Sequence, residues 1–323
     1  MLDVRRLRLL RELAHRGTIA AVADALSYTP SAVSQQLSAL EREAGTPLLA
    51  RTGRRVELTP AARALVGHAD AVLERLELAE ADLAAGRAGP AGPLGIGAFP
   101  SAARAVVPAA LATLAAAHPA LEPRLRELDP AAVAGALRAG DVDVALVHDH
   151  DFVPVPDEPA VETVALFEEA MFLAAPRTFT PRPGDSHPLR RWRDAPWIVA
   201  PVDTRCGTMT LRACEAAGFT PQARHVVDDF PAVLALVAVG GGVALVPELG
   251  VTDPGADVAL TPLPMHRRTM AAYRRGAGGN PAIAAFVDAM RTAAAGITAC
   301  ARGSRASSAT GRGPRGPAGR SRR

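Results

Sequence analysis

Residues 19–44 read IAAVADALSYTPSAVSQQLSALEREA, and this stretch decides how the N-terminal part of the chain folds. Apolar side chains recur at helical spacing on both sides of the polar turn SYT. Pro30 follows that turn at a first helical position, where its missing N–H costs nothing, and Gly45 ends the second segment. We therefore predict two helices, over 19–26 and from Pro30 to about Ala44, joined by a tight turn.

The second of these helices has two contrasting faces. Val33, Leu37 and Leu40 fall on one face, and a stripe of hydroxyl and amide groups falls on another. Glutamine can pair bidentately with adenine, and serine can donate or accept at base edges, so the stripe has the groups that a helix uses in the major groove of DNA. A solvated helix face is the alternative, but the helix is second in a helix–turn–helix pair, which favours DNA reading. The residues predicted to contact DNA here are Thr29, Pro30, Ser31, Ser34, Gln35 and Ser38.

Two further segments extend this region. Residues 48–58 are short, extended and arginine-rich, which predicts a small β-hairpin. The basic side chains of the hairpin predicted to reach phosphate groups or the minor groove are Arg51, Arg54 and Arg55. A long helix is predicted over 60–85, because apolar residues recur there near the coiled-coil repeat. The glycines and prolines of 86–93 form the clearest linker in the chain.

Residues 3–62 resemble the LysR-type regulators. The resemblance is carried by AAVADAL at 20–26, PSAVSQQL at 30–37, LLAR at 48–51 and LTP at 58–60. Leu49 stands where the family usually has phenylalanine, and Ala62 where it often has glycine; the first still fills an apolar core and the second lies within a helix. The order of the later elements is also similar to that of the family, up to about residue 295.

The resemblance implies a division of the chain and a function. It implies a winged helix-turn-helix over 1–59, a linker and dimerisation helix with a hinge over 60–88, and a periplasmic-binding-protein-like effector domain of two subdomains over 89–296. The implied protein is a transcription regulator that binds double-stranded DNA as a homodimer or homotetramer and senses a small metabolite. RNA polymerase is a further candidate partner.

The pattern after the linker is that of an α/β domain. Strands are predicted at 94–98, 121–128, 142–147, 162–168, 170–175, 197–200, 223–227, 243–246, 257–261 and 269–274, and helices at 101–117, 130–139, 207–217, 230–239 and 281–295. This alternation predicts parallel sheets, and its two-part rhythm predicts two subdomains with a cleft between them. The last 27 residues, 297–323, are rich in Gly, Ser, Arg and Pro, which predicts disorder.

Charge and cysteine content fit a regulator inside the cell. Residues 1–65 carry ten Arg and six acids, whereas 94–296 carry seventeen Arg and twenty-two acids, so a basic end precedes an acidic body. The three cysteines form no C-x-x-C pair, which fits a reduced compartment. The N-terminus has no secretory signal pattern, and no stretch is long and apolar enough to span a membrane. We therefore expect a cytoplasmic protein without a membrane partner.

Three loops at predicted strand ends are candidates for an effector site. In open α/β sheets, ligands bind at the carboxyl ends of strands and near helix N-termini. Ser101 is predicted to cap a helix, and Arg205 starts another, so a carboxylate-bearing metabolite is the expected ligand. The predicted effector-binding residues are Pro100, Ser101, His148, Asp149, Thr204, Arg205, Cys206 and Gly207.

No catalytic cluster is recognisable, so we expect neither an enzyme nor a cofactor. The pattern G-x-G-x-x-P at 95–100 lacks the third glycine of a dinucleotide fingerprint. His148 and His150 alternate with aspartates, and a solvated polar loop is favoured there over a metal site. An α/β small-molecule-binding protein or enzyme of the same fold is the alternative function, and Cys206 with Cys214 as a redox pair is a further one. A third alternative is that the arginine-rich tail is the functional nucleic-acid element.

Overall fold

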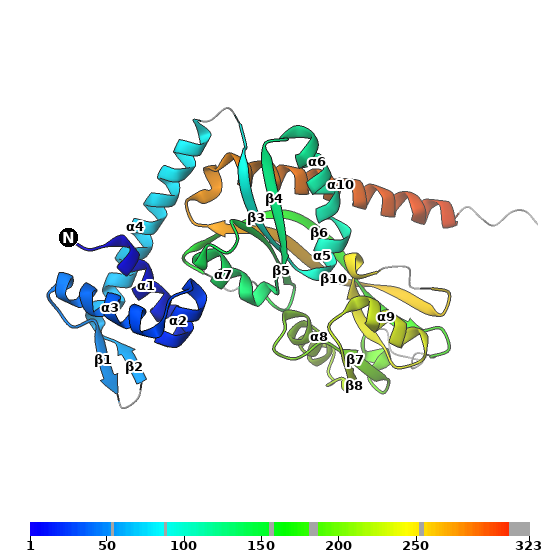
Figure 1. Cartoon of the computed structure of the whole chain (residues 1–323). Coiled ribbons are helices and arrows are strands. Elements are labelled where there is room, and N and C mark those ends of the chain that lie inside the picture. The colour runs from blue at the N-terminus through cyan, green and yellow to red at the C-terminus, as the bar shows by residue number, and fades with distance from the viewer. Residues whose placement is uncertain (53–54, 87–88, 155–157, 181–186, 252–254, 310–323) are drawn as a thin grey trace, which may run out of the picture.

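The computed structural model describes residues 1–52, 55–86, 89–154, 158–180, 187–251 and 255–309. The first 59 residues form a head made of three helices and a hairpin, with α1 at Val4–Arg16, α2 at Ile19–Leu26, α3 at Pro30–Ala44, β1 at Leu49–Thr52 and β2 at Arg55–Leu58. The long helix α4, Pro60–Ala85, leads from the head to the rest of the chain (Figure 1). The predicted helices at 19–26, 30–44 and 60–85 are confirmed with these bounds.

Local caps explain why the head helices begin and end where they do. The side chains of Asp3, Thr18, Thr29 and Thr59 each accept a hydrogen bond from a backbone N–H in the first turn of the helix that follows. Gly17 and Gly45 end α1 and α3 in the left-handed conformation. The buried faces of α1, α2, α3 and the start of α4 then close over one apolar core, which includes Leu10, Val22, Val33, Leu37, Leu40 and Ala62.

The rest of the chain, here called the body, is built on a mixed sheet. Its elements are β3 (Gly92–Ala98), α5 (Pro100–Ala105), α6 (Val107–Ala117), β4 (Leu121–Glu127), α7 (Pro130–Ala139), β5 (Val144–His150), β6 (Val161–Pro176), η1 (Arg190–Trp192), β7 (Pro196–Val199), α8 (Arg205–Ala216), β8 (Gln222–Val226), α9 (Phe230–Ala238), β9 (Ala244–Pro247), η2 (Glu248–Gly250), β10 (Val258–Arg274), η3 (Ala277–Gly279) and α10 (Pro281–Ala309). In the described part of the chain the main sheet has the order β4-β3-β5-β10-β6-β9, and β7 pairs with β8.

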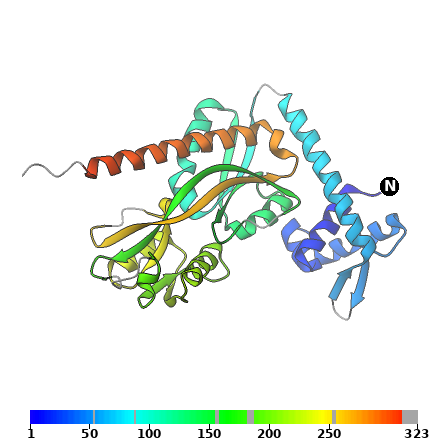
Figure 2. The same ribbon diagram turned by 180° about the vertical axis from the view of Figure 1, so that it is seen from behind.

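Two long strands join the two halves of the body. The end of β10 pairs with β5, and its beginning pairs only with β6, whose own end pairs with β9. Both strands therefore cross from a first subdomain, with β3, β4, β5, α5, α6, α7 and α10, to a second, with β7, β8, β9, α8 and α9 (Figure 2). Each subdomain has its own apolar core, and α10 covers the first together with α6.

The prediction of purely parallel sheets is wrong for these long strands. β3 is parallel to β4 and β5, but β10 is antiparallel to both β5 and β6. Each long strand was predicted as two short ones, because charged pairs interrupt its apolar run. In the structure those charges pair across the strands, since Arg267 lies opposite Glu169 and Arg268 opposite Glu168. The ion pairs let one strand continue where the hydropathy pattern ends.

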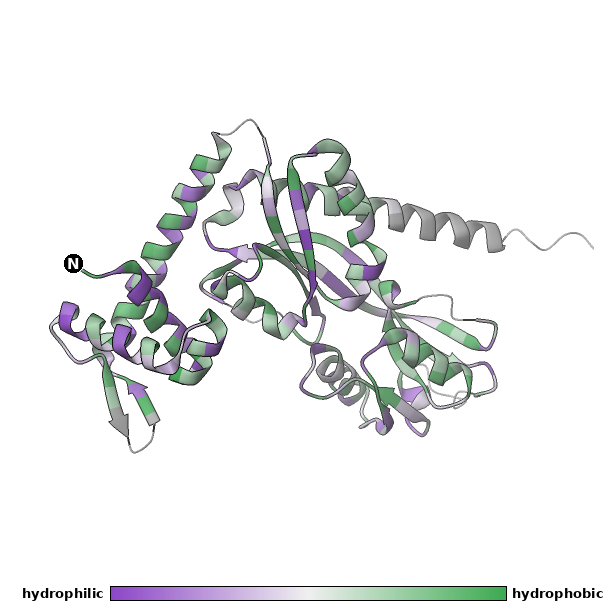
Figure 3. Ribbon diagram, viewed as in Figure 1, coloured by the Kyte–Doolittle hydropathy of each residue, from purple (hydrophilic) through white to green (hydrophobic). Residues whose placement is uncertain are grey.

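Two smaller differences concern helices. The predicted helix 101–117 is interrupted at Val106 between α5 and α6, and Pro108 has no N–H with which to continue the ladder. The last helix continues past the predicted end at 295, as far as Ala309. Figure 3 shows hydrophilic residues along β4, which lies at the edge of the sheet. These side chains protect the edge from pairing with another chain. Of the helices that the structure describes, none has the length and apolar character needed to cross a membrane.

Candidate DNA-binding head and effector cleft

The polar stripe of α3 lies on the surface of the head. Val33, Leu37 and Leu40 are fully buried on the opposite face, which fixes how the helix is rotated. Thr29 accepts from the backbone N–H of Ala32 at 3.2 Å, and its hydroxyl lies 3.1 Å from that of Ser31. The exposed members of the predicted set are Thr29, Pro30, Ser31, Gln35 and Ser38, and Ser34 is partly buried. The structure therefore brings the predicted base-contacting residues of α3 onto one accessible surface.

The hairpin is held to the base of this helix. The Glu41 carboxylate accepts from the backbone N–H groups of Leu48 and Leu49, both at 3.0 Å, so the end of α3 sets where β1 begins. β1 and β2 pair antiparallel, with Arg51 opposite Val56 and Thr52 opposite Arg55. The prediction of a hairpin is confirmed, and Arg51 and Arg55 lie on its two strands. Arg54 lies outside the described residues.

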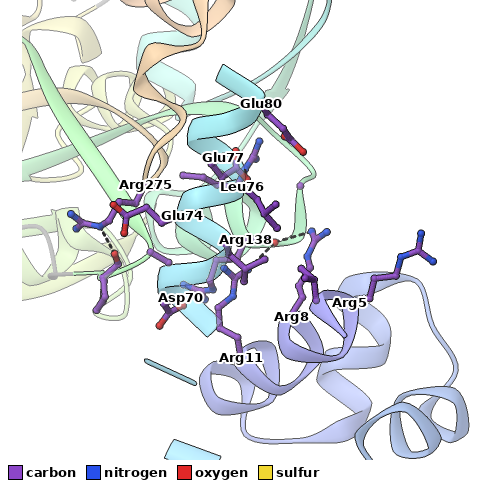
Figure 4. Close-up of a pocket in the computed structure, with 16 residues that line it drawn as sticks. Arg5, Arg8, Arg11, Asp70, Glu74, Leu76, Glu77, Glu80, Arg138 and Arg275 are labelled. Atoms are coloured by element: carbon purple, nitrogen blue, oxygen red, sulfur yellow. Dashed lines mark hydrogen bonds and ion pairs between the residues drawn. The ribbon is translucent and has the colours of Figure 1, made fainter. Parts of the chain in front are cut away.

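Other arginines of the head point toward the body instead of DNA. Arg8 donates through Nη2 to the carbonyl oxygens of Arg138 at 3.0 Å and Ala139 at 2.6 Å, which belong to the end of α7 (Figure 4). Arg16 also donates to the carbonyl of Gly135, at 3.4 Å. The last carbonyls of a helix lack intrahelical partners and carry partial negative charge, so guanidinium groups stabilise this end. Two arginines of α1 therefore hold the head against α7 of the body.

A buried carboxylate completes this contact between head and body. Glu12 is fully buried and accepts from Arg16 Nε at 2.9 Å. Its Oε1 lies 3.3 Å from Arg11 Nη2 and 3.6 Å from Arg138 Nε, and Arg138 also donates to Glu158 at 3.0 Å. Glu12 therefore compensates arginines of α1 and α7 together. The sequence did not reveal this cluster, because its members are charged residues on two separate amphipathic helices.

The cleft between the subdomains brings together most of the predicted effector residues. A cavity of about 50 Å³ lies between the first turns of α5, α8 and α9. The predicted residues that line this cavity are Pro100, Ser101, His148, Thr204, Arg205 and Cys206. Thr204 caps α8 by accepting from the N–H of Gly207 at 3.1 Å. Arg205 donates to the carbonyl oxygens of His148 at 2.9 Å and Val153 at 2.8 Å, so its guanidinium ties the two subdomains together.

Two of the predicted effector residues, Asp149 and Gly207, do not line this cavity, and Ser101 has a different role from the one predicted. Asp149 points to the other face of β5 and pairs with Arg268, whose Nε lies 2.8 Å away. Gly207 is required by packing, since a Cβ there would lie 2.0 Å from the carbonyl oxygen of Pro201. Ser101 is not a helix cap: it is the second residue of α5, and its hydroxyl accepts from Arg267 Nη2 at 3.0 Å.

Arg267 and Glu169 form a buried ion pair at the cleft that the sequence analysis missed. Arg267 is 1% exposed and its Nε donates to Glu169 Oε1 at 2.7 Å. The guanidinium carbon lies 5.0 Å from the centre of the Phe99 ring, and the second Glu169 oxygen accepts from the N–H of Leu249 at 2.7 Å. The available signal for this site was a pair of adjacent like charges within each apolar strand, Glu168-Glu169 in one and Arg267-Arg268 in the other.

A second cavity of about 570 Å³ adjoins the first and shares Thr204 and Arg205 with it. Apolar side chains including Val133, Val147 and Val153 line it, together with polar groups. Typical small-molecule sites have volumes of roughly 300–1,000 Å³. The larger cavity has the size for a metabolite, and the smaller one does not.

The prediction of a solvated loop at His148 and His150 is wrong. Both residues lie in β5 and are 3% and 1% exposed. Burial and the neighbouring Arg267 lower the pKa of His148 well below its usual value and that of His150 to about 3, so both rings are neutral. Burial also raises the pKa of the Cys206 thiol to about 11, which keeps it protonated at neutral pH.

The redox alternative is disfavoured by the same geometry. Cys206 and Cys214 both lie in α8, eight residues apart. A helix rises 1.5 Å per residue, so their Cα atoms are separated by about 12 Å along the axis, beyond the roughly 7 Å that a disulfide can span. Both thiols are free, and burial raises the pKa of Cys214 to about 12.

Comparison with known proteins identifies both parts of the chain. Residues 4–63 match the family described as bacterial regulatory helix-turn-helix protein, lysR family, and residues 87–295 match the LysR substrate binding domain. The chain is 30% identical over 254 residues to the HTH-type transcriptional regulator TfdS of Cupriavidus pinatubonensis, which covers 76% of this chain and 82% of the relative.

Solved structures show the same fold. OxyR of Corynebacterium glutamicum superposes with a TM-score of 0.58 at 23% identity, covering 94% of this chain and 96% of that one. Full-length CbnR in complex with its target DNA superposes with a TM-score of 0.51 at 24% identity, covering 91% and 100%. The predicted fold class is confirmed: a winged helix-turn-helix precedes a mixed α/β domain of two subdomains. The chain therefore belongs to the LysR family of transcription regulators.

Proposed function

We propose that the chain reads a specific DNA sequence through α3 and changes its regulatory output when a small metabolite binds between the subdomains. The observation that carries the DNA-reading part is the surface stripe of Ser31, Ser34, Gln35 and Ser38, held in place by the buried opposite face. Serine and glutamine side chains are suited to base edges in the major groove. Arg51 and Arg55 of the adjacent hairpin strands, and Arg54 next to them in the sequence, are proposed to bind phosphates or the minor groove.

We propose a homodimer or homotetramer as the working form. One helix-turn-helix covers one half-site, so two heads are needed for a full operator. Val72, Leu76 and Leu83 are exposed on α4, where a coiled-coil-like pairing with a second copy would bury them. A charged substitution of Leu76 is expected to shift the sedimentation coefficient toward the monomer and to weaken operator binding.

The effector is proposed to occupy the 570 Å³ cavity and to reach toward the cleft. Its walls offer the apolar surface of Val147 and Val153, and Arg205 is the nearest cation for a carboxylate. Because Arg205 also links the subdomains, a ligand that competes for its donors changes their spacing.

We assign no catalytic role, since the relatives are regulators, and we place the protein in the cytoplasm, where it meets DNA. RNA polymerase is proposed as a further partner of the DNA-bound form.

Footprinting with base substitutions in the operator tests the DNA-reading proposal. Gln35→Ala is expected to lose about 1–3 kcal/mol of discrimination at one base pair and little elsewhere. Arg54→Ala, the matched control, is expected to weaken binding at all sites alike and to reduce the salt dependence. Equal loss of affinity across all operator variants for Gln35→Ala would contradict the assignment of α3.

For the effector, calorimetry with carboxylate metabolites is expected to show binding that Arg205→Ala weakens.

A further inference from the structure

Three metal-ligating side chains meet at the floor of the cleft, although they come from distant parts of the sequence. His148 and His150 are two residues apart on β5, so both project from the same face of that strand. Cys206 lies in the first turn of α8, in the other subdomain. One donor atom from each of the three lies within 4.8 Å of the other two.

Three of the four imidazole nitrogens of this group lack a hydrogen-bond partner in the described part of the chain. Nδ1 of His148 and both nitrogens of His150 are buried without a hydrogen-bond partner among the residues that the structure describes. The Thr269 hydroxyl, across the strand pair from His148, is also buried and unpaired. An unsatisfied buried donor or acceptor costs about 1–3 kcal/mol. Several such groups on one strand pair, with a donor atom of each histidine and of Cys206 within 4.8 Å of one another, indicate that something outside the protein chain satisfies them.

The donor types restrict what that group can be. Neutral imidazole nitrogen and cysteine sulfur bind borderline and soft metal ions, whereas Mg²⁺ and Ca²⁺ prefer oxygen. We propose that His148, His150 and Cys206 bind one Zn²⁺ ion per chain, with a fourth position open to the cavity that His148 and Cys206 line. Three protein ligands and one open position are the usual arrangement of zinc sites that also bind a small molecule or water.

The dimensions fit an ion and not a metabolite. Zn–N and Zn–S bonds of about 2.0–2.3 Å at tetrahedral angles separate two nitrogens, or a nitrogen and a sulfur, by roughly 3.3–3.6 Å. The donors therefore need to approach by about 1 Å, which rotation of the imidazole and thiol groups supplies. The adjoining cavity of about 50 Å³ has room for a water, whose share of liquid volume is about 30 Å³.

The charges around the cluster are mixed and partly compensated. Arg267 and Arg205 both act on the two histidines, but Arg267 is paired with Glu169 at 2.7 Å, and Asp149 acts on Arg205. On binding, the Cys206 thiol gives its proton to solvent and the resulting thiolate forms the Zn–S bond, so the site gains one net positive charge. The affinity is consequently expected to fall as the pH is lowered. Because the ligands come from β5 and α8, the ion would link the two subdomains.

The test uses the full-length reduced chain with Cys214→Ala and Cys300→Ala, which leaves Cys206 as the only thiol. Competition with a chromophoric chelator is expected to give one Zn²⁺ per chain, and Co²⁺ is expected to produce a thiolate-to-cobalt charge-transfer band. Cys206→Ser should remove that band and weaken Zn²⁺ binding by about 100-fold or more, since even mutation of residues that only hydrogen-bond to metal ligands costs about 10–100-fold. His150→Ala should weaken binding to a similar degree. The control is His266→Ala, because His266 is half exposed beside Asp151 and lies outside the cluster.

Three results would overturn the proposal. The first is that the parent chain, shown by tryptophan fluorescence to be folded, takes up no stoichiometric Zn²⁺, as expected if water alone fills the gap. The second is that the cobalt band survives in Cys206→Ser. The third is that His266→Ala loses as much affinity for Zn²⁺ as His150→Ala. If His150→Ala does not fold, Cys206→Ser and the parent still decide the question, because serine is nearly isosteric with cysteine.

Discussion

Replacing Glu169 with glutamine removes the negative charge that compensates a buried arginine while keeping the shape of the side chain. Glu169 and Arg267 are 4% and 1% exposed, and their atoms approach to 2.7 Å. The two carboxylate oxygens serve two donors, Arg267 Nε and the N–H of Leu249. Glutamine has one oxygen, so one donor loses its acceptor and the guanidinium charge loses its partner. Breaking a buried pair in this way costs about 3–5 kcal/mol.

The assay is urea unfolding of the full chain followed by tryptophan fluorescence. The chain has two tryptophans, Trp192 and Trp197, and both pack in the core of the second subdomain, so the signal reports the body and not the head. The free energy of unfolding in water is obtained by linear extrapolation. The matched control is Glu168→Gln, the neighbouring residue, whose side chain is 52% exposed and 3.9 Å from Arg268. A surface pair of this kind contributes at most about 1 kcal/mol.

The reasoning fails if the two variants lose the same free energy of unfolding. A double variant, Glu169→Leu with Arg267→Met, provides a second check on the same pair. Replacing both partners of a buried pair by apolar groups is often neutral or stabilising, so the double variant is expected to be more stable than Glu169→Gln. If it is less stable, packing around Phe99 and Ser101 dominates over the charge.

Three further changes test other parts of the structure. Glu12→Gln removes the buried charge shared by arginines of the head and of α7, so protease cleavage between head and body should become faster than in the parent. Burial and three nearby aspartates raise the pKa of Asp228, so its ionised form opposes folding. Asp228→Asn should therefore raise the melting temperature at pH 7. This gain should disappear when the pH falls below 3.8, the ordinary pKa of an aspartate, because the side chain is then neutral in both the folded and the unfolded chain. Gly207→Ala places a Cβ against the Pro201 carbonyl and should lower the melting temperature strongly, whereas Gly67→Ala, which meets nothing within 4 Å, should leave it equal or raise it by the better helix propensity of alanine.

The head could be predicted almost completely from the sequence, because its determinants are local. Helical periodicity, the caps Thr18 and Thr29 and the glycines at helix ends lie within a few residues of what they specify. The proposed base-contacting residues, such as Gln35, followed from the same periodicity, since the buried face of α3 defines the exposed one. The interaction of Arg8 with α7 could not be predicted, because nothing in an arginine-rich helix says whether a guanidinium faces DNA or the body.

In the body, the sequence by itself determined that strands and helices alternate, and it pointed to Ser101, His148 and Arg205 at strand ends. Only the tertiary structure decided that 161–176 and 258–274 are single antiparallel strands. The pairing of Arg267 with Glu169 joins residues 98 positions apart, and the meeting of β5 with Cys206 likewise depends on how the subdomains close. Local patterns report which face of an element is apolar, but register and closure are set by contacts between distant segments, so the charges and ligands of the cleft are visible only once the chain is folded.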